Sequence, residues 1–266
     1  MAPPALDHII ILVPHHLLAN LPPSLTSAFT VTRGGKHADG LTENKLVILR
    51  DGSYLELIAF VPPPSSSSTS TSARDEHWWG RKLAGIIDYA LTSPSPPSSF
   101  PAAYDPPCAG GRTRPDGAAV EWLVTFPSHA FERGAVPFWC HDVTPRALRV
   151  PVDDEDKAAH PCGAVGVRRL EVRVPQRAWD EALKAYEDLP GADIVSNEDG
   201  STATLTLGTV AHADEAVEVK LVRDSERERV SFGELVLRAG AGAQGSERVQ
   251  TIELELEGGP LRIRVE

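Results

Sequence analysis

The feature of this sequence that most constrains its fold is an internal repeat. Residues 167–175 (VRRLEVRVP) align without a gap on residues 6–14 (LDHIIILVP), and each segment ends in Val-Pro ahead of a predicted helix. Short apolar runs that are rich in β-branched residues and stop at a proline are typical of β-strands. Because self-similarity within a chain indicates repeated structural units, we expect two copies of one strand–helix–strand arrangement.

Both copies are predicted to follow the order strand, helix and three strands. In the first copy, Asp51-Gly52 favours the tight turn of a β-hairpin between the last two strands. Three additional strands with alternating apolar and polar residues follow the second copy. The expected elements are a helix at 15–27 and strands at 29–32, 45–49 and 53–60 in the first copy, and a helix at 176–189 with strands at 194–196, 202–207, 216–222, 232–238, 249–256 and 261–265 in the second.

The segment between the copies changes in composition. Residues 62–72, a proline triplet followed by a Ser/Thr tract, predict a flexible, solvent-facing stretch, and a second Pro/Ser-rich loop is expected at 93–107. Apolar residues at helical spacing predict a helix at 77–91. Strands at 119–126 and 137–142 are expected to pair with each other.

Together these elements predict an α+β protein of two βαβββ modules, with curved mixed sheets packed side by side and a helical and loop insertion between them. We expect residues 1–60 to form the first module, and 61–160 to form the insertion with its helix, Pro/Ser-rich loops and sheet-extending strands. Residues 161–266 should form a second, degenerate module with extra C-terminal strands. Modules this small cannot bury a good core alone, so the parts should form one compact unit with a ligand cleft between curved sheets.

Composition narrows the range of partners. The formal net charge of −11 disfavours nucleic acid and anionic membrane surfaces, because their phosphates would be repelled. The apolar runs are too short to span a bilayer, and the first residues lack the basic start of a signal peptide. Cys108, Cys140 and Cys162 have no CxxC spacing and are interpreted as reduced thiols. We therefore expect a cytoplasmic protein that binds a small-molecule substrate, with a homodimer left open.

Two ionisable residues lie inside apolar strands and need an explanation. Strand side chains alternate between faces, so Leu6, His8 and Ile10 are expected on one face of the first strand, and Tyr54 and Glu56 on one face of the fourth. Burying an unpaired ionisable group is unfavourable by several kcal/mol. His8 and Glu56 would therefore ligate a divalent metal ion, form a proton-transfer pair, or form a buried hydrogen bond without catalysis.

A known family shares seven segments of this chain in the same order. They are LDHIIILVP from Leu6, GGKHADGLTEN from Gly34, LRDGSYLELIAF from Leu49, WWGRKLAGIIDYAL from Trp78, GGRTRPDGAAVEW from Gly110, PFWCHDVTPRALRVP from Pro137 and HPCGAVGVRRLEV from His160. Through them the chain resembles the glyoxalase-like domain family of the vicinal-oxygen-chelate superfamily. The resemblance is much less specific for a reaction, because that superfamily includes isomerases, lyases, dioxygenases, hydrolytic enzymes and binding proteins.

The resemblance implies a divalent metal ion whose ligands lie on the first and last strands of a module. Carried over residue by residue, His8 and Glu56 occupy those positions. His37 and His141 are candidates for completing a set of two histidines and one carboxylate, with a solvated or capping role as the alternative. The metal ion (Zn, Fe, Mn, Ni or Mg) would chelate adjacent substrate oxygens in a lyase or isomerase reaction. Glu56, or a histidine that does not bind the metal, would move the proton, and His141 is implied in that role.

The second half departs from this pattern. Arg169 aligns with His8 and cannot ligate a metal ion, because it has no free lone pair. Glu218 is the expected counterpart of Glu56. We therefore expect an ion pair between Arg169 and Glu218 in place of the metal ion, and a ligand site in the first half only.

Arginines form a second group of candidates. Arg112 and Arg114 lie in GGRTRPDG, which is predicted to form a shaped loop, and Arg146 and Arg149 follow the strand at 137–142. In an acidic chain, these four are predicted to bind a carboxylate, phosphate or enolate of the substrate, with salt bridges to nearby acids as the alternative. Trp79 is predicted to line the pocket, with core packing as the alternative.

Two other classes of function stay open. A metal-free binding or sequestering protein would use the same cleft, with tryptophans stacking on the ligand and arginines neutralising its charge. A protein–protein scaffold has less support, because the polar strand positions would then have no purpose. The metal content of the purified protein separates the first class from the metal-dependent enzyme.

Overall fold

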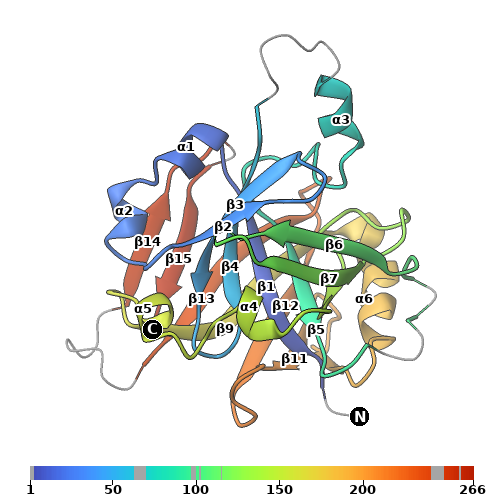
Figure 1. The fold of residues 1–266 in the computed structure, drawn as a ribbon. Helices are drawn as coiled ribbons and strands as arrows, with labels where there is room; N and C mark the ends of the chain where they lie inside the picture. Colours follow the sequence, from blue (N-terminus) through green and yellow to red (C-terminus); the bar gives the residue numbers. More distant parts are fainter. Residues whose placement is uncertain are drawn as a thin grey trace.

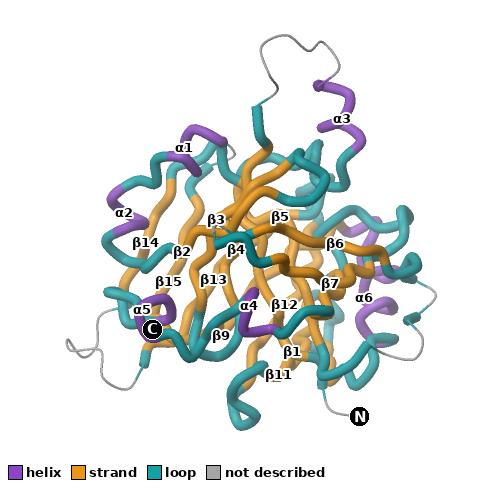
Figure 2. The backbone as a smooth tube through the Cα atoms, viewed as in Figure 1, coloured by secondary structure: helices purple, strands orange, loops and turns teal. Residues whose placement is uncertain are grey.

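The computed structural model describes residues 3–62, 70–96, 100–101, 103–114, 116–240, 249–257 and 259–266. All of the described strands belong to one connected, strongly curved sheet (Figures 1 and 2). The flexible tract expected at 62–72 falls largely outside these residues. None of the described helices has the length and apolar character needed to cross a membrane. The cytoplasmic location and the homodimer stay predictions.

The first four strands form the predicted βαβββ module. β1 pairs in parallel with β4, and β4, β3 and β2 then pair antiparallel in turn. The helix predicted at 15–27 is divided into two short helices at Pro22 and Pro23, because proline lacks a backbone N–H and clashes inside a helix. The bounds are β1 (Ala5–Leu12), α1 (His15–Ala19), α2 (Pro23–Thr26), β2 (Thr32–Lys36), β3 (Thr42–Ile48) and β4 (Tyr54–Phe60).

The segment between the modules contributes four strands with the same pairing. β5 pairs antiparallel with β1, β8 runs parallel to β5, and β7 and β6 follow antiparallel. The helix predicted at 77–91 is wrong, because its second part is β5. Most of β5 is buried on both faces, so it lacks the alternation that identifies a strand. The bounds are α3 (Ser70–Glu76), β5 (Gly85–Thr92), β6 (Cys108–Thr113), β7 (Ala119–Thr125), β8 (Phe138–Asp142), α4 (Arg146–Arg149) and α5 (Glu155–Ala158).

The second half repeats this plan with fewer strands. β9 pairs in parallel with β12, and β11 and β10 follow antiparallel. β13 pairs antiparallel with β9, as β5 does with β1, and β15 runs parallel to β13, as β8 does to β5. β14 ends the sheet beside β15. The bounds are β9 (Ala164–Pro175), a 3₁₀ helix (Gln176–Ala178), α6 (Trp179–Glu187), β10 (Asp193–Ser196), β11 (Thr202–Gly208), β12 (Ala216–Asp224), β13 (Ser231–Ala239), β14 (Gln250–Leu254) and β15 (Leu261–Val265).

The two halves share one apolar core, which confirms the predicted two-module α+β fold. Ile9 and Ile11 of β1 and Leu170 and Val172 of β9 point into this core, and α6 packs on it through Trp179. A parallel contact between β1 and β11 joins the halves edge to edge. The opposite face of each half, here called its outer face, points away from the shared core. The two halves differ most on these outer faces.

Candidate functional site

The outer face of the first half surrounds a small cavity of about 130 Å³, here called the site cavity. Side chains from β1, β3, β4, β6, β7 and β8 and from the loop before β5 line it. The edges of β2 and β6 meet beside it, where the Ala38 N–H donates a hydrogen bond of 3.0 Å to the Gly111 carbonyl and His37 forms a β-bridge with Arg112. Figure 1 shows β2–β3 and β6–β7 side by side at this contact. The first half is thereby closed into a barrel-like wall around the site cavity.

A β-bulge in β1 places two polar side chains next to this cavity. The pairing of β1 with β5 shifts register between Leu6 and His8. Leu6 therefore packs in the shared core, whereas His8 lines the site cavity. The prediction that these two side chains share a face is wrong, because the extra residue, Asp7, breaks the alternation. Both polar side chains are buried, with Asp7 0% and His8 4% exposed.

Asp7 fixes the orientation of His8. Its Oδ1 lies 2.6 Å from Nδ1 of His8, and its carboxylate accepts hydrogen bonds from Arg149 at 2.7 and 2.9 Å and from Arg146 at 2.6 Å. Burial alone raises the pKa of Asp7, but the two guanidinium groups hold it well below its usual range. An ionised Asp7 favours a proton on Nδ1 of His8, which leaves the Nε2 lone pair free for a ligand. The Tyr54 ring stacks on His8 with centroids 4.6 Å apart.

Glu56 on β4 and His37, which follows β2, converge with His8. Glu56 lies opposite Ile10 in the parallel pairing of β4 with β1. Its Oε2 is 3.4 Å from Nε2 of His8, and its Oε1 is 3.5 Å from Nε2 of His37. The Asn44 side chain donates a hydrogen bond of 2.6 Å to Oε1. Burial lowers the pKa of His37, so its ring is neutral at pH 7.

His8, His37 and Glu56 are chemically suited to a divalent cation. Two imidazole Nε2 atoms and a carboxylate are donors that transition metals favour, and a carboxylate bonded to the far nitrogen of a histidine is the usual arrangement behind a metal-bound imidazole. Among the described residues, the group whose donor atoms all lie within 4.8 Å of one another is Asp7, His8 and Cys140, whereas His8 and His37 are linked through the two oxygens of Glu56. The group with Cys140 does not suit a cation, because Arg149 already pairs with Asp7 and burial raises the pKa of Cys140 so that its thiol stays protonated.

Of the four arginines predicted to bind substrate, Arg112 and Arg149 line the site cavity and the other two do not, and Arg149 is paired with Asp7 and Asp142. Arg112 lies on β6, a strand where a loop was predicted, and its guanidinium forms no ion pair with a carboxylate of the described residues. Arg114 pairs with Asp116 at 2.8 Å, and Arg146 pairs with Asp7. The alternative explanation, salt bridges to nearby acids, therefore applies to Arg114, Arg146 and Arg149.

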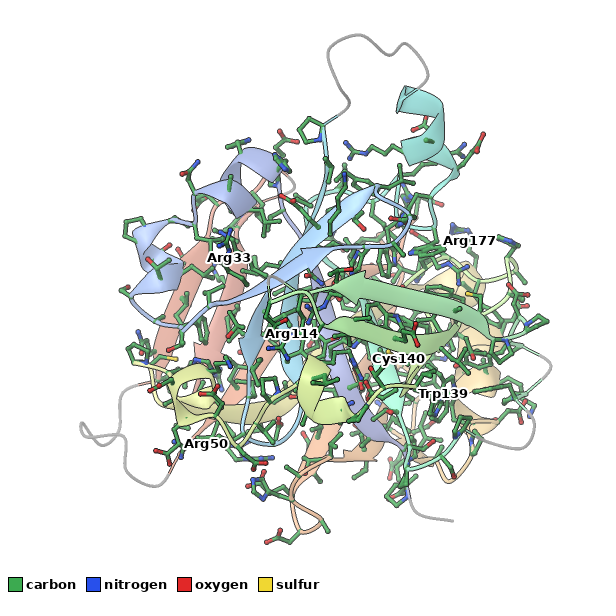
Figure 3. All side chains as sticks on the ribbon, in the orientation of Figure 1. Arg33, Arg50, Arg114, Trp139, Cys140 and Arg177 are labelled. Atoms are coloured by element: carbon green, nitrogen blue, oxygen red, sulfur yellow. The ribbon has the colours of Figure 1, made fainter. Side chains whose placement is uncertain are left out.

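The structure does not bring His141 to the site, although a catalytic role was predicted for it. Neighbouring strand residues face opposite sides, so Cys140 lines the cavity and His141 points to the other side of β8. There its Nε2 lies 2.9 Å from Oγ of Ser93, and its ring stacks on Trp139 with centroids 5.7 Å apart. Figure 3 labels Trp139 and Cys140, which mark the position of β8.

Aromatic side chains form the other wall of the site cavity. Trp79 lines it, and its indole N–H donates a hydrogen bond of 2.8 Å to Asp88. Trp78, Phe126 and Phe138 lie beside it. The cavity therefore has a polar wall that carries the histidines and an aromatic wall that faces it.

Sequence reasoning missed several residues of this site. Asp7 is a charged residue in an apolar strand, which is the signal that identified His8, but alternation assigned it to the opposite face. Asn44 gave no signal of its own. His77, which also lines the cavity, was hidden inside the helix predicted at 77–91. Burial lowers the pKa of His77 to about 4.

The second half carries different residues at the corresponding positions of its outer face. The register of β9 with β12 makes Lys220, and not Glu218, the counterpart of Glu56. The predicted ion pair between Arg169 and Glu218 is wrong. Glu218 is exposed, and Arg169 pairs with Glu234 of β13 at 3.2 Å.

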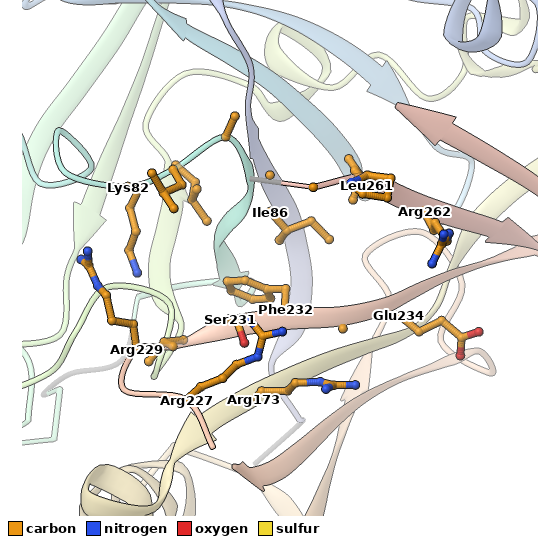
Figure 4. A pocket seen from close by; sticks show the side chains of 18 of the residues that line it. Lys82, Ile86, Arg173, Arg227, Arg229, Ser231, Phe232, Glu234, Leu261 and Arg262 are labelled. Carbon is orange, nitrogen blue, oxygen red and sulfur yellow. The ribbon is translucent and has the colours of Figure 1, made fainter. Parts of the chain in front are cut away.

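A larger cavity of about 830 Å³, here called the charged cavity, opens beside β13 and β15 (Figure 4). Arg173, Arg227 and Arg229 surround it, and each of these arginines pairs with a nearby acid. Its described lining contains neither histidine nor cysteine. Solvated ion pairs of this kind are common on protein surfaces. The candidate site is therefore the site cavity of the first half.

Within the first half, β1–β4 and β5–β8 each pair their first and last strands in parallel, and the two groups join through β1 and β5. With the candidate ligands His8 on β1 and Glu56 on β4, this arrangement defines a vicinal-oxygen-chelate protein. The chain belongs to the glyoxalase-like domain family, whose family model matches residues 6–189. A search of curated proteins finds no match.

Similarities to solved structures extend over nearly the whole chain. A hypothetical protein from Staphylococcus aureus matches with a TM-score of 0.69 and 13% identity, over 99% of this chain and 100% of that one. A mutant of 4-hydroxymandelate synthase from Streptomyces coelicolor matches with a TM-score of 0.47 and 8% identity, over 99% of this chain and 92% of that one. At such low identity, the first similarity establishes the fold and leaves the activity undetermined.

Proposed function

We propose that this chain is a divalent-metal-dependent enzyme that carries out lyase or isomerase chemistry on a small oxygenated substrate in the site cavity. The observation that carries the proposal is the convergence of His8, His37 and Glu56 on one side of the site cavity. Arg112, which has no acidic partner among the described residues, lies in the same cavity.

His8, His37 and Glu56 would hold the metal ion. Their mixed nitrogen and oxygen donors favour a transition metal such as zinc, iron, manganese or nickel over magnesium, which binds mainly oxygen. A divalent ion bound there would supply Lewis-acid polarisation of adjacent substrate oxygens. Asp7 supports this role, since it fixes the protonated Nδ1 of His8 and thereby the direction of Nε2.

The protein side chains would bind the substrate and move its proton. Arg112 is buried and would use its free N–H groups to bind a substrate carboxylate or enolate. Asn44 donates a hydrogen bond to Oε1 of Glu56, so Oε2 is the oxygen that would either hold the metal ion or, where the substrate takes that position, accept a proton from a substrate carbon and return it. The aromatic wall and the contact of β2 with β6 would keep bulk water out, which strengthens each of these interactions.

Metal analysis of the purified protein tests this proposal. We expect one divalent ion per chain by elemental analysis, and its loss in both His8→Ala and Glu56→Gln. His141→Ala is the matched control, since it removes a buried histidine of the same half that faces away from the site cavity. Folded protein that binds no zinc, manganese or nickel would contradict the proposal and favour a metal-free binding protein.

A further inference from the structure

We propose that the substrate of the site cavity is a small aromatic acid: a single planar ring that bears a carboxylate and an adjacent oxygen. This inference rests on the proposed function, because the His8–His37–Glu56 set determines where the oxygens lie. The inference adds the chemical class of the part of the substrate that does not contact the metal ion. Three features support it, namely the aromatic wall, an exposed tryptophan beside the cavity, and the cavity volume.

The aromatic wall lies directly against the candidate metal ligands. Phe138 packs edge-on against His8 with ring centroids 5.5 Å apart. The ring centroids of Phe138 and Phe126 are 4.9 Å apart, and those of Phe126 and Trp78 are 4.8 Å apart. A ring whose oxygens contact His8 would therefore meet aromatic faces and edges, and such contacts contribute about 0.5–1.5 kcal/mol each beyond the burial of apolar area.

Two tryptophans beside the cavity have surface left for a ligand. Trp78 is 42% exposed although it lines the cavity. Trp122 lies across β6 beside His37, with ring centroids 6.1 Å apart. Gly110 makes this position available, because a Cβ at Gly110 would lie 2.3 Å from Nε1 of Trp122. The glycine in the GGRTRPDG segment thus leaves room for an indole wall over the site.

The size of the cavity matches one ring. Its volume of about 130 Å³ is close to the roughly 150 Å³ of an engineered apolar cavity that binds benzene. It is well below the roughly 300–1,000 Å³ of pockets for drug-sized ligands. A single ring therefore fills it, whereas the remainder of a larger ligand would extend past Trp78 into solvent. Arg112 then selects an acid over a neutral ring, because its charge has no acidic partner in the described part of the chain.

Calorimetric titration with three small probes tests the proposal. 2-Hydroxybenzoate carries the ring, the carboxylate and the adjacent oxygen; 2-hydroxypropanoate keeps the two oxygen groups without the ring; phenol keeps the ring without the carboxylate. We expect 2-hydroxybenzoate to bind at least about tenfold more tightly than either of the others, since each omitted group removes roughly 1.4 kcal/mol or more.

Two variants should separate the ring contribution from the acid contribution. Trp78→Ala should weaken 2-hydroxybenzoate several-fold and leave 2-hydroxypropanoate unchanged, whereas Arg112→Met should weaken both acids and leave phenol unchanged. Leu83→Ala is the control, since Leu83 is 74% exposed and lies outside the site cavity. Equal affinity for the two acids, or no binding of 2-hydroxybenzoate up to its solubility limit, would overturn the inference. Metal binding at His8 would then still support the proposed function, so the two failures are distinguishable.

Discussion

The outer faces of the two halves use the same strand pairing for different surfaces. In the first half, His8 of β1 lines the site cavity, and the next side chains on the same face of β1 pack in a buried apolar cluster beside it. In the second half, the same positions of β9 carry exposed or half-buried ion pairs. The residues that correspond are His8, Ile10 and Leu12 in β1, and Arg169, Glu171 and Arg173 in β9.

Closure of the sheet accounts for much of this difference. β2 and β6 meet in the first half, whereas in the second half the described strands end at β14, beside which α2 packs. A closed wall excludes water, and electrostatic interactions become stronger where water is excluded. The shared pairing pattern alone therefore does not place polar side chains around a cavity. The candidate metal ligands occur in the half whose edges meet.

Removing one buried arginine should have the largest effect on stability. Arg149 is 3% exposed and donates to both Asp7 and Asp142. Arg149→Met would leave two carboxylates short of a partner, and we expect a loss of about 3–5 kcal/mol in the free energy of unfolding, measured by urea denaturation. Arg173→Met in the second half should change it by only about 0–1 kcal/mol, because its ion pair is solvated. Similar losses for both variants would remove the distinction between the two faces.

Loss of the carboxylate behind His8 should weaken metal binding. Asp7→Asn keeps the shape of the side chain but no longer holds the proton on Nδ1 of His8. We expect zinc affinity to fall about 10–100-fold by calorimetric titration. The residue that aligns with Asp7 in the second half is Arg168, which is largely exposed, and Arg168→Gln should leave the affinity unchanged. Unchanged affinity in Asp7→Asn would show that Asp7 serves only the ion pairs with arginine.

Acid should destabilise the first half through His77. Burial lowers the pKa of this histidine from 6.5 to about 4. The neutral buried ring stabilises the fold fully above the unfolded pKa, and this stability, on the order of 2 kcal/mol, is lost as the pH falls from about 6.5 toward about 4. Asp88 has the opposite effect over this range, because burial raises its pKa to about 6. Protection from hydrogen exchange, corrected for the intrinsic exchange rate, should therefore fall less on acidification in β1–β8 of His77→Asn than in the unmodified protein.

Substitution of Arg169, the second-half counterpart of His8, should have the smallest effect on stability. Arg169 pairs with Glu234 on a half-exposed face. Arg169→Met should change the free energy of unfolding by at most about 1 kcal/mol and should leave metal content unchanged. A larger loss would indicate that this ion pair stabilises the second half in place of a metal ion.

The fold could be predicted from the sequence wherever strands alternate between faces or repeat an earlier segment. The strands of the second half follow this rule, and the structure confirms them. β5 breaks it, because a strand buried on both faces has the apolar run of a helix, and the choice between them depends on neighbours distant in the chain. β5 is a strand because it pairs with β1, which lies far away in the sequence, so the local pattern at 77–91 could not identify it.

The site could be predicted only in part, for a similar reason. His8, Glu56, His37 and Arg112 come from four different strands or their ends, and the structure brings them into one cavity. The bulge at Asp7 depends on the register with β5, which the local sequence does not specify. The expected position of His141 at the site is not observed, because neighbouring residues of a strand face opposite sides and Cys140 is the one that lines the cavity.

The most direct test of the difference between the two halves is the location of a bound metal ion. A crystal soaked in manganese chloride and measured with anomalous scattering would show it. We expect one anomalous peak, coordinated by His8, His37 and Glu56 in the site cavity. A peak at Asp7 and Cys140, a peak beside Glu171 and Lys220 of the second half, or no peak at a saturating manganese concentration would contradict the account.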